Sequence, residues 1–255
     1  MRPEIVDFVS RKLLNYDGSH DFYHAKRVVY NTLHASNRLN RELCCICALT
    51  HDVCDTKYVN KEQSLNELHT FLINYTSSNK AEQIKNIVRN ISYTKLKKDG
   101  EPILTPRLLN IWRIVSQADM LEAMGIVGVM RTIIYQGYKN ESLDNALNYI
   151  EYDLVNCVQY MKYTSFIQEA EHRHVVMKDL ITRMRIENTK EQQFAYHLLN
   201  YGHRKLSFDS IILNISKYHI LPESFWTSWN RELNWSANYL SVEDTNLMAR
   251  FNQQH

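Results

Sequence analysis

Residues 41–58 read RELCCICALTHDVCDTKY, and this stretch decides the fold. From Glu42 to His51 the residues are apolar almost all round, which predicts a helix in the middle of a domain. The adjacent pair His51 and Asp52 would then stand at the end of that buried helix. Imidazole and carboxylate groups at a helix end can bind a divalent cation, although an isolated His-Asp dipeptide is usually structural.

On the amino-terminal side, residues 21–36 carry apolar or small residues at the three-and-four spacing of one buried helix face. This pattern predicts a helix with His24 on its first turn. The preceding residues 16–19, YDGS, predict a turn, with Ser19 or His20 near the helix cap.

On the carboxyl-terminal side, helical spacing recurs and no strand alternation is sustained. Residues 92–107 contain Asp-Gly, two prolines and clustered lysines, which predicts an exposed loop. The helix after that loop would deliver Asp119 near its end, before Gly125 and Gly128 interrupt the pattern. The expected helical segments are residues 65–75, 84–91, 108–119, 143–160, 166–184, 208–215 and 225–235.

The composition points to an all-α fold. The 255 residues include only 6 glycines and 4 prolines, so turns should be few and elements long. The net charge of +2 argues against a nucleic-acid partner, and no apolar run has the length of a membrane span or signal. Five cysteines form an odd set that suits a reducing compartment. We therefore expect a cytoplasmic protein with no membrane partner, and its oligomeric state stays open, a homo-oligomer included.

Four potential metal ligands stand at helix ends or first turns: His24, His51, Asp52 and Asp119. Imidazole and carboxylate together suit Mn²⁺, Mg²⁺, Fe²⁺, Ni²⁺ or Co²⁺ better than a thiolate-type zinc site does, and of these ions we favour Mn²⁺. Such an ion would lower the pKa of a water molecule and offset charge on a phosphoryl oxygen. The cysteines are too close together, and lack a second pair, for a structural zinc site.

Three ordered motifs resemble the HD-domain phosphohydrolase superfamily. They are SHDFYHAKRV (19–28), ALTHDVCDTKY (48–58) and SQADMLEAMGIVGVMRT (116–132). They are most similar to a branch of small bacterial and fungal proteins that includes nucleoside-triphosphate pyrophosphohydrolases, and that reads HDxxHxxRV, LLHDxxDxK and QDADRLDAxGxxGxxRT. A further segment, AEHRHVVMKDLITRM (170–184), resembles its closing helix. The resemblance spans about residues 15–188.

This resemblance implies a helical bundle in which His24, His51, Asp52 and Asp119 bind one divalent ion. It also implies that Asp55 and Lys57 face the substrate. Asp55 would orient or deprotonate the attacking water, and Lys57 would pair with phosphate oxygens. Arg27 is a candidate phosphate contact, and His20 a candidate proton donor to the leaving group.

The chain departs from the branch pattern in three places, one of them Thr50, which precedes His51 where Leu or Phe is usual. Met120 and Glu122 stand where the branch has Arg and Asp, so a basic side chain beside the last ligand is missing. After residue 188 the chain becomes rich in Asn, Ser, Tyr and Trp. We therefore predict an HD domain over residues 1–188 and a helical extension over residues 189–255.

The predicted activity is metal-dependent hydrolysis of a nucleotide, favouring conversion of a nucleoside triphosphate to a monophosphate and pyrophosphate. Two enzymatic alternatives on the same scaffold are a 5′-nucleotidase and a phosphodiesterase. A third alternative is a ligand-sensing or interaction protein that retains the metal site while its extension does the work.

Overall fold

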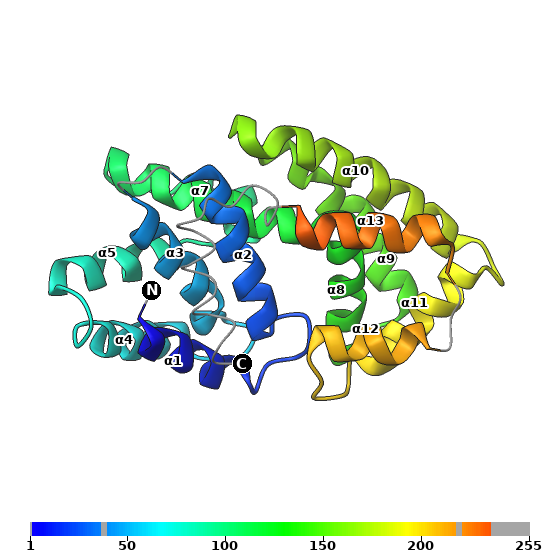
Figure 1. Ribbon diagram of the computed structural model, residues 1–255, viewed down its shortest axis with the longest axis horizontal. Coiled ribbons are helices and arrows are strands. Elements are labelled where there is room, and N and C mark those ends of the chain that lie inside the picture. Colours follow the sequence, from blue (N-terminus) through cyan, green and yellow to red (C-terminus); the bar gives the residue numbers. More distant parts are fainter. Residues whose placement is uncertain (1, 37–39, 218–220, 236–255) are drawn as a thin grey trace. The chain divides into compact units, whose positions relative to one another are not determined.

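The computed structural model describes residues 2–36, 40–217 and 221–235. All regular secondary structure in these ranges is helical, which confirms the predicted all-α fold (Figure 1). The described residues separate into two compact units. The first unit consists of residues 2–14, 25–36 and 40–119, and the second of residues 15–24, 120–217 and 221–235.

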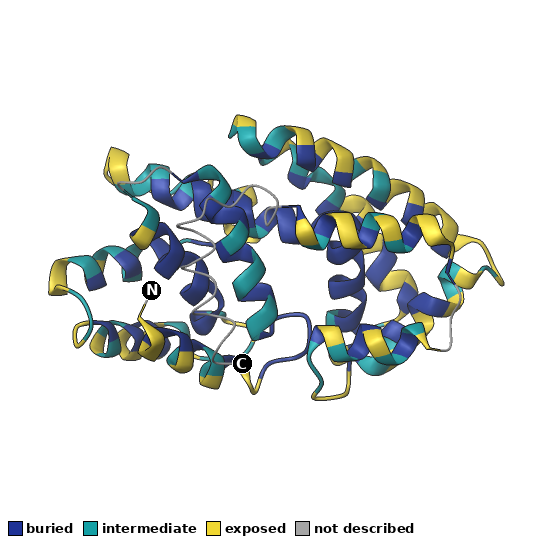
Figure 2. Ribbon diagram, in the orientation of Figure 1, coloured by how far each residue is buried: buried dark blue, intermediate teal, exposed yellow. Residues whose placement is uncertain are grey.

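The first unit is built around α3, the helix predicted from its all-round apolar sequence. Residues 43–50 of α3 are all buried, and the helix contacts α1 and α5 (Figure 2). A short 3-10 helix, η1, continues directly from its end. In chain order the helices are α1 (Pro3–Leu13), α2 (Phe22–Ala35, from Ala25 onward), α3 (Arg41–Thr50), η1 (His51–Cys54), α4 (Lys61–Leu72), α5 (Ser78–Val88), α6 (Tyr93–Asp99) and α7 (Pro106–Glu122, up to Asp119).

The second unit is built around α8 in the same way. This helix is buried along almost its whole length and contacts α9, α10, α11 and α13 (Figure 2). Residues 15–24 and the last turn of α7 also belong to this unit. Its further helices are α8 (Gly125–Tyr138), α9 (Leu143–Tyr152), η2 (Leu154–Tyr160), α10 (Thr164–Arg185), α11 (Lys190–Tyr201), α12 (Phe208–Ser216) and α13 (Glu223–Asn234).

Polar side chains begin many of these helices. In each case an oxygen of the capping side chain accepts a hydrogen bond from a backbone N–H of the first turn. The caps of this kind are Asn60, Ser77, Ser92, Ser142, Thr189 and Ser207.

Two predicted elements differ in the structure. Residues 92–107 were expected to form a loop, but Ser92 caps a helix, α6, that ends at Gly100 with a φ of 78°. The predicted helical segment 143–160 divides into α9 and the 3-10 helix η2. Its buried residues Leu154 and Cys157 are three apart, which suits the three residues per turn of a 3-10 helix.

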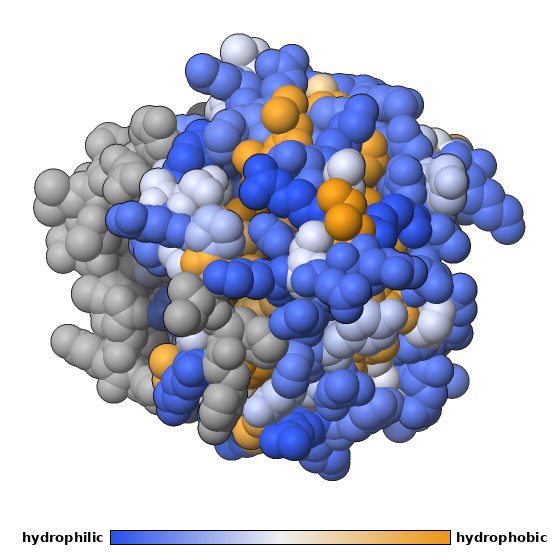
Figure 3. Space-filling model, turned by 90° about the vertical axis from the view of Figure 1, so that its right-hand side faces the viewer, coloured by the Kyte–Doolittle hydropathy of each residue, from blue (hydrophilic) through white to orange (hydrophobic). Residues whose placement is uncertain are grey.

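The predicted boundary at residue 188 lies between α10 and α11, inside the second unit. The helices predicted within residues 189–255 are present as α12 and α13, with α11 before them. Among the described residues, no helix has the length and apolar character needed to cross a membrane. The side of the molecule seen in Figure 3 is mostly hydrophilic, with apolar surface in small separate areas.

Candidate metal centre

His51 lies where α3 passes into η1, and its ring is oriented by the helix that precedes it. Its Nδ1 lies 2.7 Å from the carbonyl oxygen of Ala48. Because a carbonyl oxygen only accepts, Nδ1 carries the proton of this bond. In the neutral ring the lone pair is then on Nε2, the atom through which His51 can bind a cation.

Two carboxylates face this nitrogen within the first unit. His51 Nε2 lies 3.3 Å from Asp52 Oδ1 and 3.5 Å from Asp119 Oδ1. His51 and Asp52 are buried, and Asp119 is partly exposed near the end of α7. The structure therefore brings three of the four predicted ligands together. One nitrogen and two carboxylate oxygens, within 3.3 and 3.5 Å of that nitrogen, are a donor set that suits a divalent cation.

The electrostatics of this cluster favour positive charge. Burial by itself lowers the pKa of His51, but the carboxylates of Asp52 and Asp119 outweigh it and raise that pKa well above 6.5. Two buried or half-buried carboxylates beside one imidazole thus favour a cation at this point.

His24, the fourth predicted ligand, lies in the second unit, on the first turn of α2. Its backbone N–H donates to Asp21 Oδ1 at 2.9 Å, so Asp21 caps the helix, where Ser19 or His20 had been expected. The His24 ring is buried, and its Nδ1 lies 3.8 Å from Glu122 Oε2 in the same unit. That separation is within ion-pair range and longer than a hydrogen bond.

His20 is held by the turn that precedes α2. Its Nδ1 lies 2.7 Å from Ser19 Oγ and 3.3 Å from Asp17 Oδ2. Arg131 of α8 fixes the same turn, because its Nε donates to the carbonyl oxygen of Ser19 at 2.7 Å. The His20 ring also packs edge-on against Tyr135, with 5.3 Å between the ring centroids. A histidine held through Nδ1 in this way has a fixed ring orientation.

Asp55 and Lys57, predicted to face the substrate, pair with each other in the segment after η1. Lys57 Nζ lies 3.2 Å from Asp55 Oδ2, and the Lys57 N–H donates to Asp55 Oδ1 at 2.9 Å. Arg27, the candidate phosphate contact, is half-buried on α2, three residues after His24. The structure thus pairs Asp55 with Lys57.

Glu122 is the site residue that sequence reasoning did not select. It appeared only as a departure from the branch pattern, yet its side chain is buried beside His24 and its backbone carbonyl accepts from Arg131 Nη1 at 2.9 Å. The available signal was its spacing, since a residue three after Asp119 shares a helix face with that ligand.

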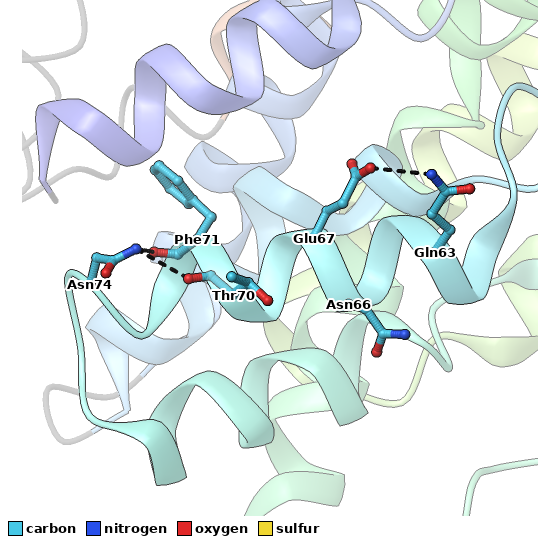
Figure 4. A pocket seen from close by; sticks show the side chains of 6 residues that line it. All are labelled: Gln63, Asn66, Glu67, Thr70, Phe71 and Asn74. Carbon is cyan, nitrogen blue, oxygen red and sulfur yellow. Dashed lines mark hydrogen bonds between the residues drawn. The ribbon is translucent and has the colours of Figure 1, made fainter.

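A surface hollow along α4 is unrelated to the predicted site. It has a volume of about 730 Å³ and contains none of the predicted ligands (Figure 4). Glu67 is the one carboxylate on its wall and pairs with Lys12 of α1 at 2.6 Å. One carboxylate among amide and hydroxyl groups is a poor metal site. The hollow is lined by Gln63, Asn66, Glu67, Thr70, Phe71 and Asn74.

Comparison with known proteins gives likenesses to small bacterial proteins, while no family model matches the chain. The uncharacterized protein YpgQ of Bacillus subtilis is 23% identical over 189 residues, covering 71% of this chain and 90% of YpgQ. The crystal structure of YpgQ in complex with ADP has a TM-score of 0.57, covering 71% of this chain and 94% of that one.

An HD-superfamily hydrolase from Bacillus thuringiensis is 25% identical, with a TM-score of 0.55 and coverage of 70% of this chain and 92% of that chain. These likenesses support the HD-domain superfamily that the sequence motifs resemble, and with it a hydrolase. Together with the His and Asp cluster, they support a phosphohydrolase that depends on a divalent metal.

Proposed function

We propose that this chain hydrolyses a nucleoside triphosphate to the monophosphate and pyrophosphate. The observation that carries the proposal is the orientation of His51, whose Nε2 faces Asp52 and Asp119 while its Nδ1 donates to a backbone carbonyl. The sequence likeness to the pyrophosphohydrolase branch supports the reaction. The binding of ADP by YpgQ, a relative at 23% identity, supports a nucleotide as the substrate.

His51, Asp52 and Asp119 hold one divalent ion in this proposal, and His24 completes the set. All four offer nitrogen or oxygen donors, which favours Mn²⁺ and is compatible with Mg²⁺, Fe²⁺, Ni²⁺ or Co²⁺. When bound, such an ion lowers the pKa of a water molecule and offsets phosphoryl charge. The helices α2 and α7 supply His24 and Asp119, each within one residue of the division between the units.

Asp55 and Lys57 exchange partners when substrate binds. The side chain of Lys57 is 39% exposed and that of Asp55 18% exposed, so a phosphate can reach the ammonium group. Lys57 then clamps the phosphate chain, and Asp55 accepts a proton from the attacking water. Arg27 adds a second positive contact to the phosphates.

His20 donates a proton to the leaving group. Its Nδ1 is occupied by Ser19 and Asp17, so the proton is delivered from Nε2. The Asp17 carboxylate, 3.3 Å from Nδ1, helps to hold the ring in the orientation that this role requires.

A nucleotide panel with Mn²⁺, resolved by product, tests the proposal. Wild type should release pyrophosphate, whereas orthophosphate would indicate a nucleotidase and ring opening of a cyclic nucleotide a phosphodiesterase. Chelation should abolish turnover and added Mn²⁺ restore it. Asp52→Ala and Asp119→Ala should each lose at least about 100-fold in turnover, because each removes a metal ligand.

Asp99→Ala is the matched control, since Asp99 is an exposed aspartate of α6 in the same unit. It should retain wild-type turnover. If wild type hydrolyses nothing, or if all three variants behave like wild type, the enzyme proposal fails and the sensing alternative gains support.

A further inference from the structure

Helix α13, in the predicted extension, makes a partly buried ionic contact with α10. Arg231 Nη2 lies 2.7 Å from Glu169 Oε2, and Arg231 Nη1 lies 3.2 Å from Glu169 Oε1. The same carboxylate accepts from Arg173 Nε at 2.8 Å. Arg173 is fully buried and Glu169 almost so. A charged side chain buried this deeply is stable only when it is paired with an opposite charge. The three side chains therefore form one ion-pair network.

Arg173 extends this contact to the end of α7. Its Nη1 donates to the carbonyl oxygen of Leu121 at 2.9 Å and lies 3.9 Å from Glu122 Oε1. The other carboxylate oxygen of Glu122 is the atom that lies 3.8 Å from His24 Nδ1. A continuous series of charges therefore runs from Arg231 through Glu169, Arg173 and Glu122 to His24, all within the second unit.

Helix α12 of the extension contacts the His24 turn by a separate route. Asp21 caps α2 through Oδ1, and its Oδ2 accepts from the backbone N–H of Phe208, the first residue of α12, at 2.8 Å. Gly18 lies so close to this segment that a Cβ there would overlap the carbonyl oxygen of Leu206. The turn before His24 is therefore held against residues 206–208 by one hydrogen bond and one close backbone approach.

We infer that Glu122 orients the His24 imidazole for a cation and that the C-terminal extension holds this pair in place. With Nδ1 directed at a carboxylate, His24 presents Nε2 as its ligand atom and becomes a stronger donor. Arg173 lies 3.9 Å from Glu122 and helps to hold its carboxylate toward the ring. Arg231 in turn pairs with Glu169, the partner of Arg173. Glu122 and Arg231 are positioning residues, and the inference rests on the proposed role of His24 as a ligand.

Affinity for Mn²⁺ measures this role without reference to turnover. Free Mn²⁺ is counted by its paramagnetic resonance signal during titration of the full chain. Glu122→Gln should weaken binding about 10- to 100-fold, as loss of a carboxylate partner to a ligating histidine does. Arg231→Met acts one step further away and should weaken it about 2- to 30-fold.

Arg185→Met is the matched control, because Arg185 of α10 forms an exposed pair with Glu151 in the same unit. It should bind Mn²⁺ like wild type. Nitrogen NMR of the histidine rings provides a second readout: Glu122→Gln should change the signals of the His24 ring and leave those of His51 unchanged. If Glu122 only stabilised the fold, its substitution would not change the NMR signals of the His24 ring alone.

The outcomes separate the inference from the proposed function. If wild type and Asp52→Ala both fail to bind Mn²⁺, the proposed metal site fails. If wild type binds and Glu122→Gln binds equally tightly, the orienting role of Glu122 is overturned. Arg231 is 44% exposed, so its variant should fold even if a Glu122 variant does not. If Arg231→Met binds as tightly as Arg185→Met, the role of the extension is overturned.

Discussion

Lys57 and Asp55 neutralise each other in the structure, although both are expected to act on the substrate. Lys57→Met should reduce kcat/KM for a nucleoside triphosphate about 10- to 100-fold, because a hydrogen bond to a charged group contributes about 1.5–3 kcal/mol. Lys80→Met is the control, since Lys80 of α5 pairs with Glu42 away from the predicted site residues. Steady-state kinetics measures kcat/KM for both variants. Equal values for Lys57→Met and Lys80→Met would contradict the role of Lys57 in binding phosphate.

Glu232 is a buried carboxyl group whose ionisation opposes folding. Its Oε1 and Oε2 accept from the backbone N–H groups of Ile126 and Val127 at 3.0 and 3.1 Å. Burial nevertheless raises its pKa to about 7, against the lowering by Arg173 and by these two hydrogen bonds. Glu169 adds to the rise. The folded state therefore holds this proton more tightly than the unfolded chain.

The stability that this proton provides is fully present below pH 4.5 and is lost as the pH rises through about 7. The loss amounts to about 3 kcal/mol of unfolding free energy. Glu232→Gln resembles the protonated acid at every pH, so its stability relative to wild type should increase between pH 5 and pH 8. Denaturant unfolding of both proteins across that range measures this difference. A difference that stays constant with pH would show that Glu232 does not titrate there.

At the scale of single residues, the sequence indicated which histidine and carboxylates come together better than it indicated their partners. His51 and Asp52 are neighbours in the chain, and the ordered motifs added Asp119, so these three could be named in advance. Glu122 could not be assigned a partner, because its proximity to His24 depends on how α7 and the turn before α2 come together in the second unit. That arrangement is tertiary, and helix periodicity does not encode it.

Among the elements, α8 and α11 pack closely, and glycine makes this approach feasible. A Cβ at Gly137 of α8 would overlap the carbonyl oxygen of Leu199, and one at Gly202 would overlap that of Ile134. Gly137→Ala should therefore lower the unfolding free energy by about 1–3 kcal/mol. Helix propensity alone would raise the unfolding free energy of Gly137→Ala by up to about 1 kcal/mol. The sign of the measured change therefore shows which effect is larger.

Asn200→Ala provides the comparison, because Asn200 is an exposed residue of α11 beside Leu199. It should leave stability unchanged or slightly raised. Chemical denaturation of both variants gives the two free energies. If Gly137→Ala is as stable as wild type, the two helices do not pack as closely as the structure places them.

Helix existence was predictable where the apolar spacing was strong, as in α3, α10 and α12. It was missed in α6, where Lys95, Lys97 and Lys98 stand near Asp-Gly and two prolines. None of the residues of α6 is buried, so no apolar face was available to detect. The remaining signal in the sequence was Ser92, whose Oγ caps the helix by accepting a hydrogen bond from the Lys95 N–H. Exposed helices that depend on their caps escape a periodicity argument.

For the whole molecule, composition predicted the fold class, whereas the compact units depend on tertiary contacts. Few glycines and prolines pointed to long helices, and helices are what the described residues form. The boundary at residue 188 was predicted from a change in amino-acid composition along the chain. That boundary stays a prediction, and the compact units divide at α2 and α7, because each unit contains segments distant in sequence. Contacts between distant segments of the chain cannot be recognised from the local sequence.

The five cysteines belong to this scale, since all are buried and none forms a disulfide. Burial raises the pKa of Cys44 and of Cys54 to about 12, and that of Cys47 well above 9.0. Only the thiolate is nucleophilic, so native thiols should alkylate at least about 100-fold more slowly than the same thiols in denaturant at pH 7.5. Timed iodoacetamide labelling, read by intact mass, measures both rates, with glutathione in the same tube as the reagent control. A cysteine that reacts natively at the denatured rate would show that its part of the molecule opens readily, against the burial found for all five.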